Sequence, residues 1–250
     1  MRHESEELAR EYDAALSSLT LEKRLEFVAE RYPSTVFTSS LGLEDQAITH
    51  AIANNTSKIQ IVTLNTGRLF SESLALLNQT RELYKIHIDE FHPIPESIEA
   101  YKTRHGLNGF YENMEARQTC CHIRKIEPLQ RALTNADSWV TGLRREQSQN
   151  RNEVPFSEWS ESNQLMKFNL LADWTLKELN TFLETNNVPI SALHARGYPS
   201  IGCEPCTRAI KPGESERAGR WWWENEQKRE CGLHVASQNE TSKQSIPLSK

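Results

Sequence analysis

The fold is decided by one stretch near the N-terminus, Ser34-Thr35-Val36-Phe37-Thr38-Ser39-Ser40-Leu41-Gly42-Leu43-Glu44-Asp45. Residues 34–38 form a short run with β-branched and aromatic side chains, which predicts a buried strand. A turn of small residues follows, and a helix is expected from there to about Asn54. At such a strand–turn–helix junction, unpaired backbone N–H groups and the helix dipole can hold an anion. Because Ser and Gly occur in many turns of this kind, the stretch alone does not establish a phosphate site.

The rest of the chain alternates between the two kinds of element. Further strands are expected over residues 59–64, 86–88, 138–143 and 165–169. Besides the helix that ends near Asn54, helices are expected over residues 71–83, 96–105, 115–133 and 175–186, after a helical segment over residues 1–32. This alternation predicts an α/β fold with a doubly wound, mainly parallel sheet. Because ligands bind such sheets at the carboxyl ends of the strands, we expect the turns at residues 39–42, 64–67 and 142–145 to share one rim.

The length of 250 residues suits one compact domain. We expect that domain over residues 1–234, followed by a disordered polar tail over residues 235–250. No stretch approaches the roughly 18 apolar residues that span a bilayer, and the acidic N-terminus lacks the apolar core of a secretory signal. These features predict a cytoplasmic protein without a membrane partner. The sequence does not fix the oligomeric state, and a homo-oligomer is compatible with it.

The net charge of −5 argues against a nucleic-acid partner, because proteins that bind phosphate backbones usually carry a basic surface. Any anionic ligand must therefore be held by local cations. Arginine can bind phosphate or sulfate oxygens with two parallel hydrogen bonds, while lysine acts as a compact charge. The candidate cations lie beside other motifs: Arg124, Lys125, Arg144, Arg145, Arg217 and Arg220.

The five cysteines divide into four and one. Cys120 and Cys121 are adjacent, and Cys203 and Cys206 form a C-x-x-C. Zinc ligands usually come in pairs spaced about two to four residues apart, whereas neighbouring thiolates can bind different irons of a cluster. The pattern therefore favours a shared iron–sulfur site. Two buried helix cysteines beside a separate redox pair, or half a zinc site, remain the alternative.

The fifth cysteine lies in Glu230-Cys231-Gly232-Leu233-His234. A nucleophilic cysteine needs thiolate character, which a nearby cation or imidazole supplies, and His234 is three residues away. The neighbouring polar tail suggests a segment that can move. Taken alone, these residues are also compatible with an incidental surface cysteine.

Together the motifs resemble the assimilatory sulfonucleotide reductases, and within them the iron–sulfur branch that acts on adenylyl sulfate. The resemblance spans residues 36–234, nearly all of the expected domain. The matching segments are Ser39-Ser40-Leu41-Gly42-Leu43-Glu44-Asp45, Leu64-Asn65-Thr66-Gly67-Arg68-Leu69-Phe70, Cys120-Cys121-His122-Ile123-Arg124-Lys125, Gly142-Leu143-Arg144-Arg145-Glu146-Gln147-Ser148, Cys203-Glu204-Pro205-Cys206-Thr207-Arg208, Gly219-Arg220-Trp221-Trp222-Trp223-Glu224 and Glu230-Cys231-Gly232-Leu233-His234.

The resemblance implies an adenine-nucleotide α-hydrolase-like fold with a mobile C-terminal segment. It implies a [4Fe-4S] cluster on Cys120, Cys121, Cys203 and Cys206. It also implies that Cys231 attacks the sulfur of adenylyl sulfate, giving AMP and an S-sulfonated cysteine. Thioredoxin or glutaredoxin would then release sulfite.

The resemblance also implies a set of substrate contacts. Lys125, Arg217, Arg220 and His234 would contact the phosphosulfate. Arg144 or Arg145 would belong to a loop that closes over the substrate. The nucleotide would be held by the turn containing Ser39, Ser40 and Gly42, with the backbone of Leu64 at the adenine.

Three alternatives differ in their demands on the sequence. Cluster-free relatives that reduce phosphoadenylyl sulfate lack the two cysteine pairs, so the four cysteines favour adenylyl sulfate, with a dual-substrate enzyme as a further alternative. ATP-cleaving enzymes of this fold carry a Ser-Gly-Gly-x-Asp-Ser loop, of which only Gly42 remains here, and no Ser follows Asp45. A non-catalytic metal-binding module would leave Cys231 and His234 unexplained.

Overall fold

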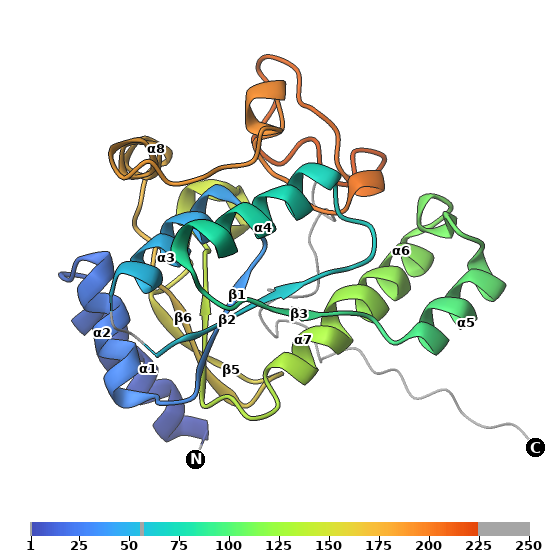
Figure 1. The fold of residues 1–250 in the computed structure, drawn as a ribbon. Helices are drawn as coiled ribbons and strands as arrows, with labels where there is room; N and C mark the ends of the chain where they lie inside the picture. The colour runs from blue at the N-terminus through green and yellow to red at the C-terminus, as the bar shows by residue number, and fades with distance from the viewer. Residues whose placement is uncertain (1, 56–57, 225–250) are drawn as a thin grey trace, which may run out of the picture.

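The computed structural model describes residues 2–55 and 58–224, which form one α/β assembly (Figure 1). Its strands are β1 (Thr35–Ser39), β2 (Gln60–Leu64), β3 (Asp89–Phe91), β4 (Ser138–Thr141), β5 (Ser157–Ser160) and β6 (Leu165–Asn169). Its α-helices are α1 (Arg2–Leu16), α2 (Leu21–Arg31), α3 (Leu43–Asn54), α4 (Ser71–Tyr84), α5 (Pro95–His105), α6 (Met114–Cys121), α7 (Glu127–Ala132) and α8 (Leu176–Thr185). The predicted nucleophile Cys231, its neighbour His234 and the expected tail 235–250 lie outside the described residues.

The described strands form one sheet in the order β3-β2-β1-β4-β6-β5. Every neighbouring pair is parallel except β5 and β6. The central strand β1 pairs with β2 on one side, where Phe37 lies opposite Ile61, and with β4 on the other, where Val36 lies opposite Trp139. The order reverses direction between β1 and β4, which is the switch point at which doubly wound sheets bind ligands. The predicted mainly parallel, doubly wound fold is confirmed.

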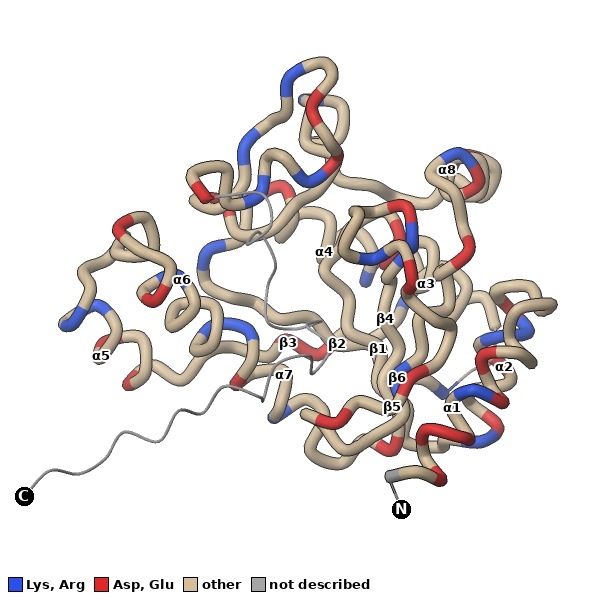
Figure 2. The backbone as a smooth tube through the Cα atoms, turned by 180° about the vertical axis from the view of Figure 1, so that it is seen from behind, with Lys and Arg blue, Asp and Glu red and all other residues tan. Residues whose placement is uncertain are grey.

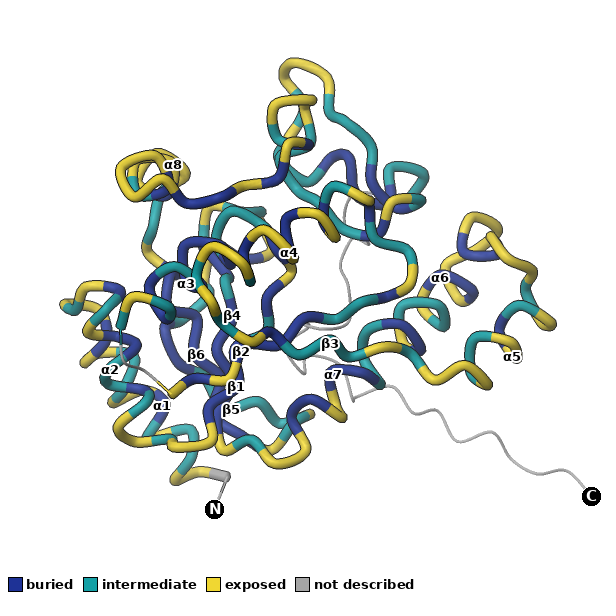
Figure 3. Tube along the Cα trace, viewed as in Figure 1, coloured by how far each residue is buried: buried dark blue, intermediate teal, exposed yellow. Residues whose placement is uncertain are grey.

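Alternate residues of the strands face two separate cores, as the period of a β-strand requires. Phe37, Val140 and Phe168 pack into the larger core, which α1, α2, α3, α4 and α8 cover. Their neighbours Val36 and Trp139 pack on the opposite face, against α7. Burial accordingly follows the strands through the middle of the molecule (Figure 3). Strands buried on both faces explain why the sequence shows continuous apolar runs rather than alternation.

The third strand lies three residues later than predicted. Lys85 takes up a left-handed conformation directly after α4, with φ of 53°. Ile88 packs into the core from an irregular segment, and pairing with β2 begins only at Asp89. The apolar residues therefore marked a buried segment correctly, but the hydrogen-bonded ladder starts after them.

The predicted helix over residues 115–133 contains an interruption. A π-helical turn, His122–Ile126, joins α6 to α7. Pro128 lies at the start of α7 and has no N–H to donate to the carbonyl four residues earlier. A wider turn accommodates this loss and is a common feature of functional sites. The antiparallel edge strand β5 was not predicted, because its Ser-Glu-Trp-Ser sequence is too polar for the pattern of a buried strand.

Charged residues are dispersed over the described part of the chain. Figure 2 shows acidic and basic positions interspersed along the backbone, without a continuous basic stripe. In the same residues, no helix has both the length and the apolar character needed to cross a membrane.

One buried ion pair fastens the N-terminal helices to the end of β6. The guanidinium of Arg24 donates to the carbonyls of Leu16 and Leu170 at 3.0 and 2.8 Å, and it forms a two-point pair with Asp173 at 2.7 and 2.8 Å. Its side chain is only 3% exposed. These contacts connect residues about 146 positions apart.

Arg24→Met should lower the free energy of unfolding by about 2–3 kcal/mol, because it leaves two carbonyls and a carboxylate without their donor. Urea unfolding measures the change. Lys23→Met is the matched control, since Lys23 forms an exposed pair with Glu26 and such pairs contribute little. Equal losses for the two variants would contradict the assigned role of Arg24.

Candidate active site

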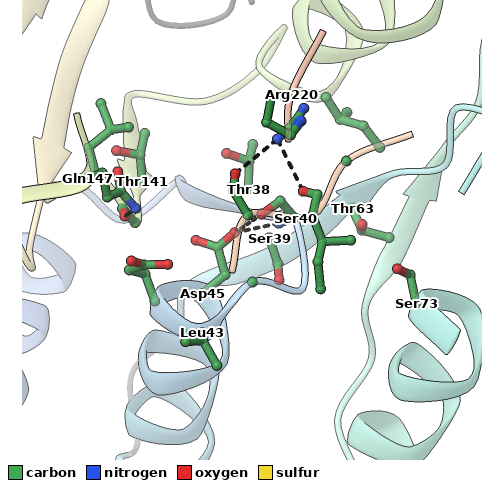
Figure 4. Close-up of a pocket in the computed structure, with 18 of the residues that line it drawn as sticks. Thr38, Ser39, Ser40, Leu43, Asp45, Thr63, Ser73, Thr141, Gln147 and Arg220 are labelled. Carbon is green, nitrogen blue, oxygen red and sulfur yellow. Dashed lines mark hydrogen bonds between the residues drawn. The ribbon is translucent and has the colours of Figure 1, made fainter. Parts of the chain in front are cut away.

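The turn between β1 and α3 is held from within by a buried aspartate. The backbone N–H and the hydroxyl of Ser40 both donate to Oδ2 of Asp45, at 2.5 and 2.6 Å. The hydroxyl of Ser39 accepts from the N–H of Leu41, whose φ is 64°. Burial raises the pKa of Asp45 to about 7, although the bonds from Ser40 oppose the shift. Figure 4 shows Asp45 directed at this turn.

The start of α3 remains open to a ligand. Gly42 is the N-cap and offers no side chain to cap the helix. Helix N-termini attract anions through their first N–H groups and the helix dipole. The predicted rim at residues 39–42 is therefore fit to hold a phosphate.

A cleft runs along the carboxyl ends of β1, β2 and β4 and encloses about 1300 Å³ of space, part of it open to solvent. Seven of the predicted substrate contacts line it: Ser39, Ser40, Gly42, Leu64, Lys125, Arg217 and Arg220. The three expected turns contribute to one rim, since Thr66 and Gly142 line the cleft as well. The topology of the parallel sheet thus brings together residues that are far apart in the sequence.

Two arginines enter the cleft from the last described segment. Arg220 donates to the hydroxyl of Ser200 and to the carbonyl of Ile201, both at 3.3 Å, and stacks over Trp221 at 4.9 Å. Its Nε is buried without a hydrogen-bond partner among the described residues. Arg217 donates to the same hydroxyl at 3.5 Å. Figure 4 shows Arg220 across the cleft from the turn at Ser39 and Ser40. A buried guanidinium with a spare donor is suited to a sulfate or phosphate oxygen.

Arg220 dictates a glycine in the facing segment. A Cβ added to Gly202 would lie 2.2 Å from a terminal nitrogen of the Arg220 guanidinium. The chain therefore approaches the arginine closely only because this residue has no side chain.

The predicted pair Arg144 and Arg145 is not among the residues that line the cleft. Arg144 is fully buried and pairs with Glu44 at 2.7 Å. Arg145 donates to the carbonyl of Val154 and lies 5.2 Å from the ring of Phe156. Both arginines thus hold the loop after β4 in place.

Two residues of the same loop line the cleft although the sequence did not predict them as site residues. Gln147 and Arg151 line the cleft, and Arg151 donates to Oε1 of Gln147 at 2.5 Å. The only available signal was a further basic residue a few positions beyond the Arg144–Arg145 pair. Its direction relative to the cleft depends on two short 3-10 turns that no periodicity reveals.

Four cysteines surround a second, smaller hollow beside the cleft. Cys120 and Cys121 reach it from the end of α6, while Cys203 and Cys206 flank a short turn. Its other lining residues are Arg68, Phe110, Arg124, Lys125, Pro205 and Trp221. All four predicted thiol ligands are therefore brought together, and none of these four forms a disulfide.

The cysteine hollow is tied to β2 by backbone and side-chain contacts. Leu69 and Cys203 form an isolated bridge, and the hydroxyl of Thr66 lies 3.3 Å from Sγ of Cys203. Arg124 donates to the carbonyl of Thr66 at 2.6 Å. These contacts join the π-helical turn, the end of β2 and the C-x-x-C.

Burial disfavours charge on the thiols of this hollow. It raises the pKa of Cys206 to about 12, and the neighbouring Cys203 raises it further while Lys125 opposes the shift. Burial also raises the pKa of Cys120, with Arg124 acting in the opposite direction. Thiolates crowded in this way become favourable when a bound cationic centre compensates their charge.

In the part of the chain that the structure describes, no group of three or more His, Cys, Asp or Glu side chains is arranged to hold a single metal ion. The thiolates of an iron–sulfur cluster bind different irons and need not converge on one point. The donor set of four thiols around one hollow fits such a cluster better than a mononuclear site.

Lys125 and Cys203 line both the cleft and the cysteine hollow. The two sites therefore share a wall. A cation in that wall is in a position to act on groups in either site.

Known proteins are similar to this chain over most of its length. The family described as the phosphoadenosine phosphosulfate reductase domain matches residues 34–209. The adenosine 5'-phosphosulfate reductase of Agrobacterium fabrum is 55% identical over 229 residues, which is 92% of this chain and 88% of that protein. The protein of the same name from Allochromatium vinosum is 50% identical and covers 83% of this chain and 81% of its own length.

Solved structures support the fold. The phosphoadenylyl-sulfate reductase of Candida auris, in a phosphate complex, superposes with a TM-score of 0.71 at 24% identity and covers 82% of this chain and 98% of that one. An FMN adenylyltransferase mutant from Candida glabrata gives a TM-score of 0.52 at 14% identity, covering 86% and 78%.

Gly142→Ala should disturb the rim of the cleft. A Cβ at this position would lie 2.2 Å from Oδ1 of Asp45, so the carboxyl that holds Ser40 must move. We expect a loss of about 1–3 kcal/mol in the free energy of unfolding, which is typical of overpacking, together with weaker nucleotide binding.

Gly42→Ala is the control for stability, since a Cβ there meets no atom closer than 3.4 Å. Chemical denaturation and calorimetric titration with AMP measure the two effects. If Gly142→Ala were as stable as Gly42→Ala and bound AMP like the wild type, Asp45 would not control the turn.

Proposed function

The chain belongs to the phosphoadenosine phosphosulfate reductase family, and we propose that it reduces adenylyl sulfate to sulfite and AMP in sulfate assimilation. Relatives about half identical to it over most of their length are named adenosine 5'-phosphosulfate reductase. The observation that carries the proposal is the wall shared by the nucleotide-sized cleft and the four-cysteine hollow. A phosphosulfate bound in the cleft would lie beside Lys125.

The substrate would lie along the rim of the sheet. The turn containing Ser39, Ser40 and Gly42 would hold the nucleotide, with the backbone of Leu64 at the adenine. Arg217 and Arg220 would contact the phosphosulfate, together with Lys125 and with His234 from beyond the described residues. The spare donor of Arg220 and the presence of Lys125 and Arg217 in the lining of the cleft support this orientation. Arg144 and Arg145 would act on the loop after β4 rather than on the substrate directly.

The reaction begins with attack of the Cys231 thiolate on the sulfur of the sulfonyl group. The S–O bond to the phosphate breaks, AMP leaves, and the sulfonate stays on the cysteine. Cations beside the phosphate stabilise the negative charge that develops on the leaving group. A dithiol reductant, thioredoxin or glutaredoxin, then attacks Sγ of Cys231 and expels sulfite. Its second thiol resolves the mixed disulfide, so the reductant supplies both electrons.

A [4Fe-4S] cluster would be held by Cys120, Cys121, Cys203 and Cys206. The position of all four thiols around one hollow supports it. When bound, the cluster supplies a structural tie and a local charge. Lys125 and Arg124 then balance the thiolates from the protein side. We also propose a cytoplasmic location, where reduced thiols and dithiol reductants are available.

Cys231→Ser tests the function. The variant should release no sulfite from adenylyl sulfate with reduced thioredoxin, while it keeps the broad visible absorbance of an iron–sulfur cluster. Cys206→Ser is the reciprocal variant and should lose iron, sulfide and colour. Sulfite release by Cys231→Ser would overturn the mechanism, and a colourless wild type that contains zinc would overturn the cluster.

Competition between substrates tests the choice of nucleotide. Adenylyl sulfate should give the higher kcat/KM when it competes with phosphoadenylyl sulfate in the same sulfite assay. The reverse preference would assign the chain to the second substrate.

A further inference from the structure

A fully buried arginine lies behind the wall of the cleft. Arg144 follows β4 and has no exposed surface. Its Nε donates to Oε1 of Glu44 at 2.7 Å. Its two terminal nitrogens have no hydrogen-bond partner among the residues that the structure describes, but each lies 3.6 Å from a carboxylate oxygen, one of Glu146 and one of Glu216. One guanidinium thus serves three carboxylates from three separate segments.

Two of these three carboxylates belong to the wall of the cleft. Glu44 and Glu216 both line the cleft, and their side chains are only 12% and 23% exposed. Asp45 lines the cleft beside them. A cleft for a phosphosulfate would not be expected to carry acidic groups, because like charges placed together weaken binding. The effect is larger in a partly buried site than in water.

Neighbouring charges act on the carboxyl of Glu216 in opposite directions. Burial raises the pKa of Glu216 to about 7, and Glu44 raises it further. Arg144 is the largest influence in the opposite direction, ahead of Arg217 and Arg151. Glu216 directly precedes Arg217 in the sequence, and the charge of Arg217 also lowers the pKa of Glu216.

We propose that Arg144 is the buried counter-charge that allows Glu44 and Glu216 to line an anion-binding cleft. It is a positioning residue, which acts on the substrate through these two carboxylates and does not touch it. The carboxylates in turn connect α3, the loop after β4 and the segment that carries Arg217. The inference rests on the proposed nucleotide site but not on the reductase chemistry.

The test compares AMP with adenosine by calorimetric titration of the holoenzyme at pH 8. Arg144→Met should weaken AMP binding by about tenfold or more, because Glu44 and Glu216 then lose their shared counter-charge beside the phosphate. Adenosine carries no charge, so its affinity should change much less. Arg144→Lys, which keeps the charge, should recover part of the AMP affinity.

A second substitution separates charge from structure. In Arg144→Met/Glu216→Gln, removal of one carboxylate should restore most of the lost AMP affinity, so the two effects are strongly non-additive. Arg24→Met is the control for loss of a buried arginine far from the cleft, and it should bind AMP like the wild type.

Additive effects, or equal losses for AMP and adenosine, would overturn the inference and leave the proposed function standing. A wild type that does not bind AMP would overturn both. If Arg144→Met does not fold, recovery of a folded protein by adding Glu216→Gln still supports the counter-charge, and failure of the double variant to fold overturns it.

Discussion

The carboxyl ends of parallel strands all lie at the same edge of a sheet. This constraint determines where the described residues of the proposed site lie. β1 lies at the switch point between β2 and β4, so the turns that follow these three strands meet along one edge. Asp45 then fixes the first turn by accepting two bonds from Ser40. The open N-terminus of α3 and the cleft beside it depend on that local arrangement.

A second constraint is the balance of buried charge. Four thiols gather in one hollow, and the substrate proposed for the adjacent cleft is an anion. Cations must therefore separate the thiols from that anion. The π-helical turn supplies these cations: Arg124 binds the carbonyl of Thr66, and Lys125 lies in the wall between the two sites. On the other side of the cleft, Arg144 balances the negative charge of the carboxylates that surround it.

The last described segment completes both sites by returning to the end of β2. Glu204 donates its backbone N–H to the carbonyl of Arg68 at 2.8 Å, and Cys203 forms a bridge with Leu69. The N–H of Trp221 donates to the carbonyl of Cys206 at 3.1 Å. One irregular segment therefore carries two thiols to the hollow and Arg217 and Arg220 to the cleft. Because this segment folds back on itself, Gly202 lies against the guanidinium of Arg220 and has no room for a side chain.

The strand–turn–helix stretch at residues 34–45 and the spacing of the cysteines were readable from the sequence, because both are local patterns. The alternation of strands with helices predicted the parallel sheet, and the parallel sheet predicted the common rim. The start of β3 and the edge strand β5 could not be predicted, since hydrogen-bonded pairing with a distant neighbour defines them.

The roles of the arginines show the same limit. The sequence by itself determined that cations accompany each motif, and it identified Lys125, Arg217 and Arg220 beside the proposed ligand sites. Only the tertiary structure decided that Arg144 turns inward to Glu44 while Arg151 turns toward the cleft. The physical reason is that a guanidinium is directed by the carboxylates and carbonyls around it, and these come from segments that meet only when the chain is folded.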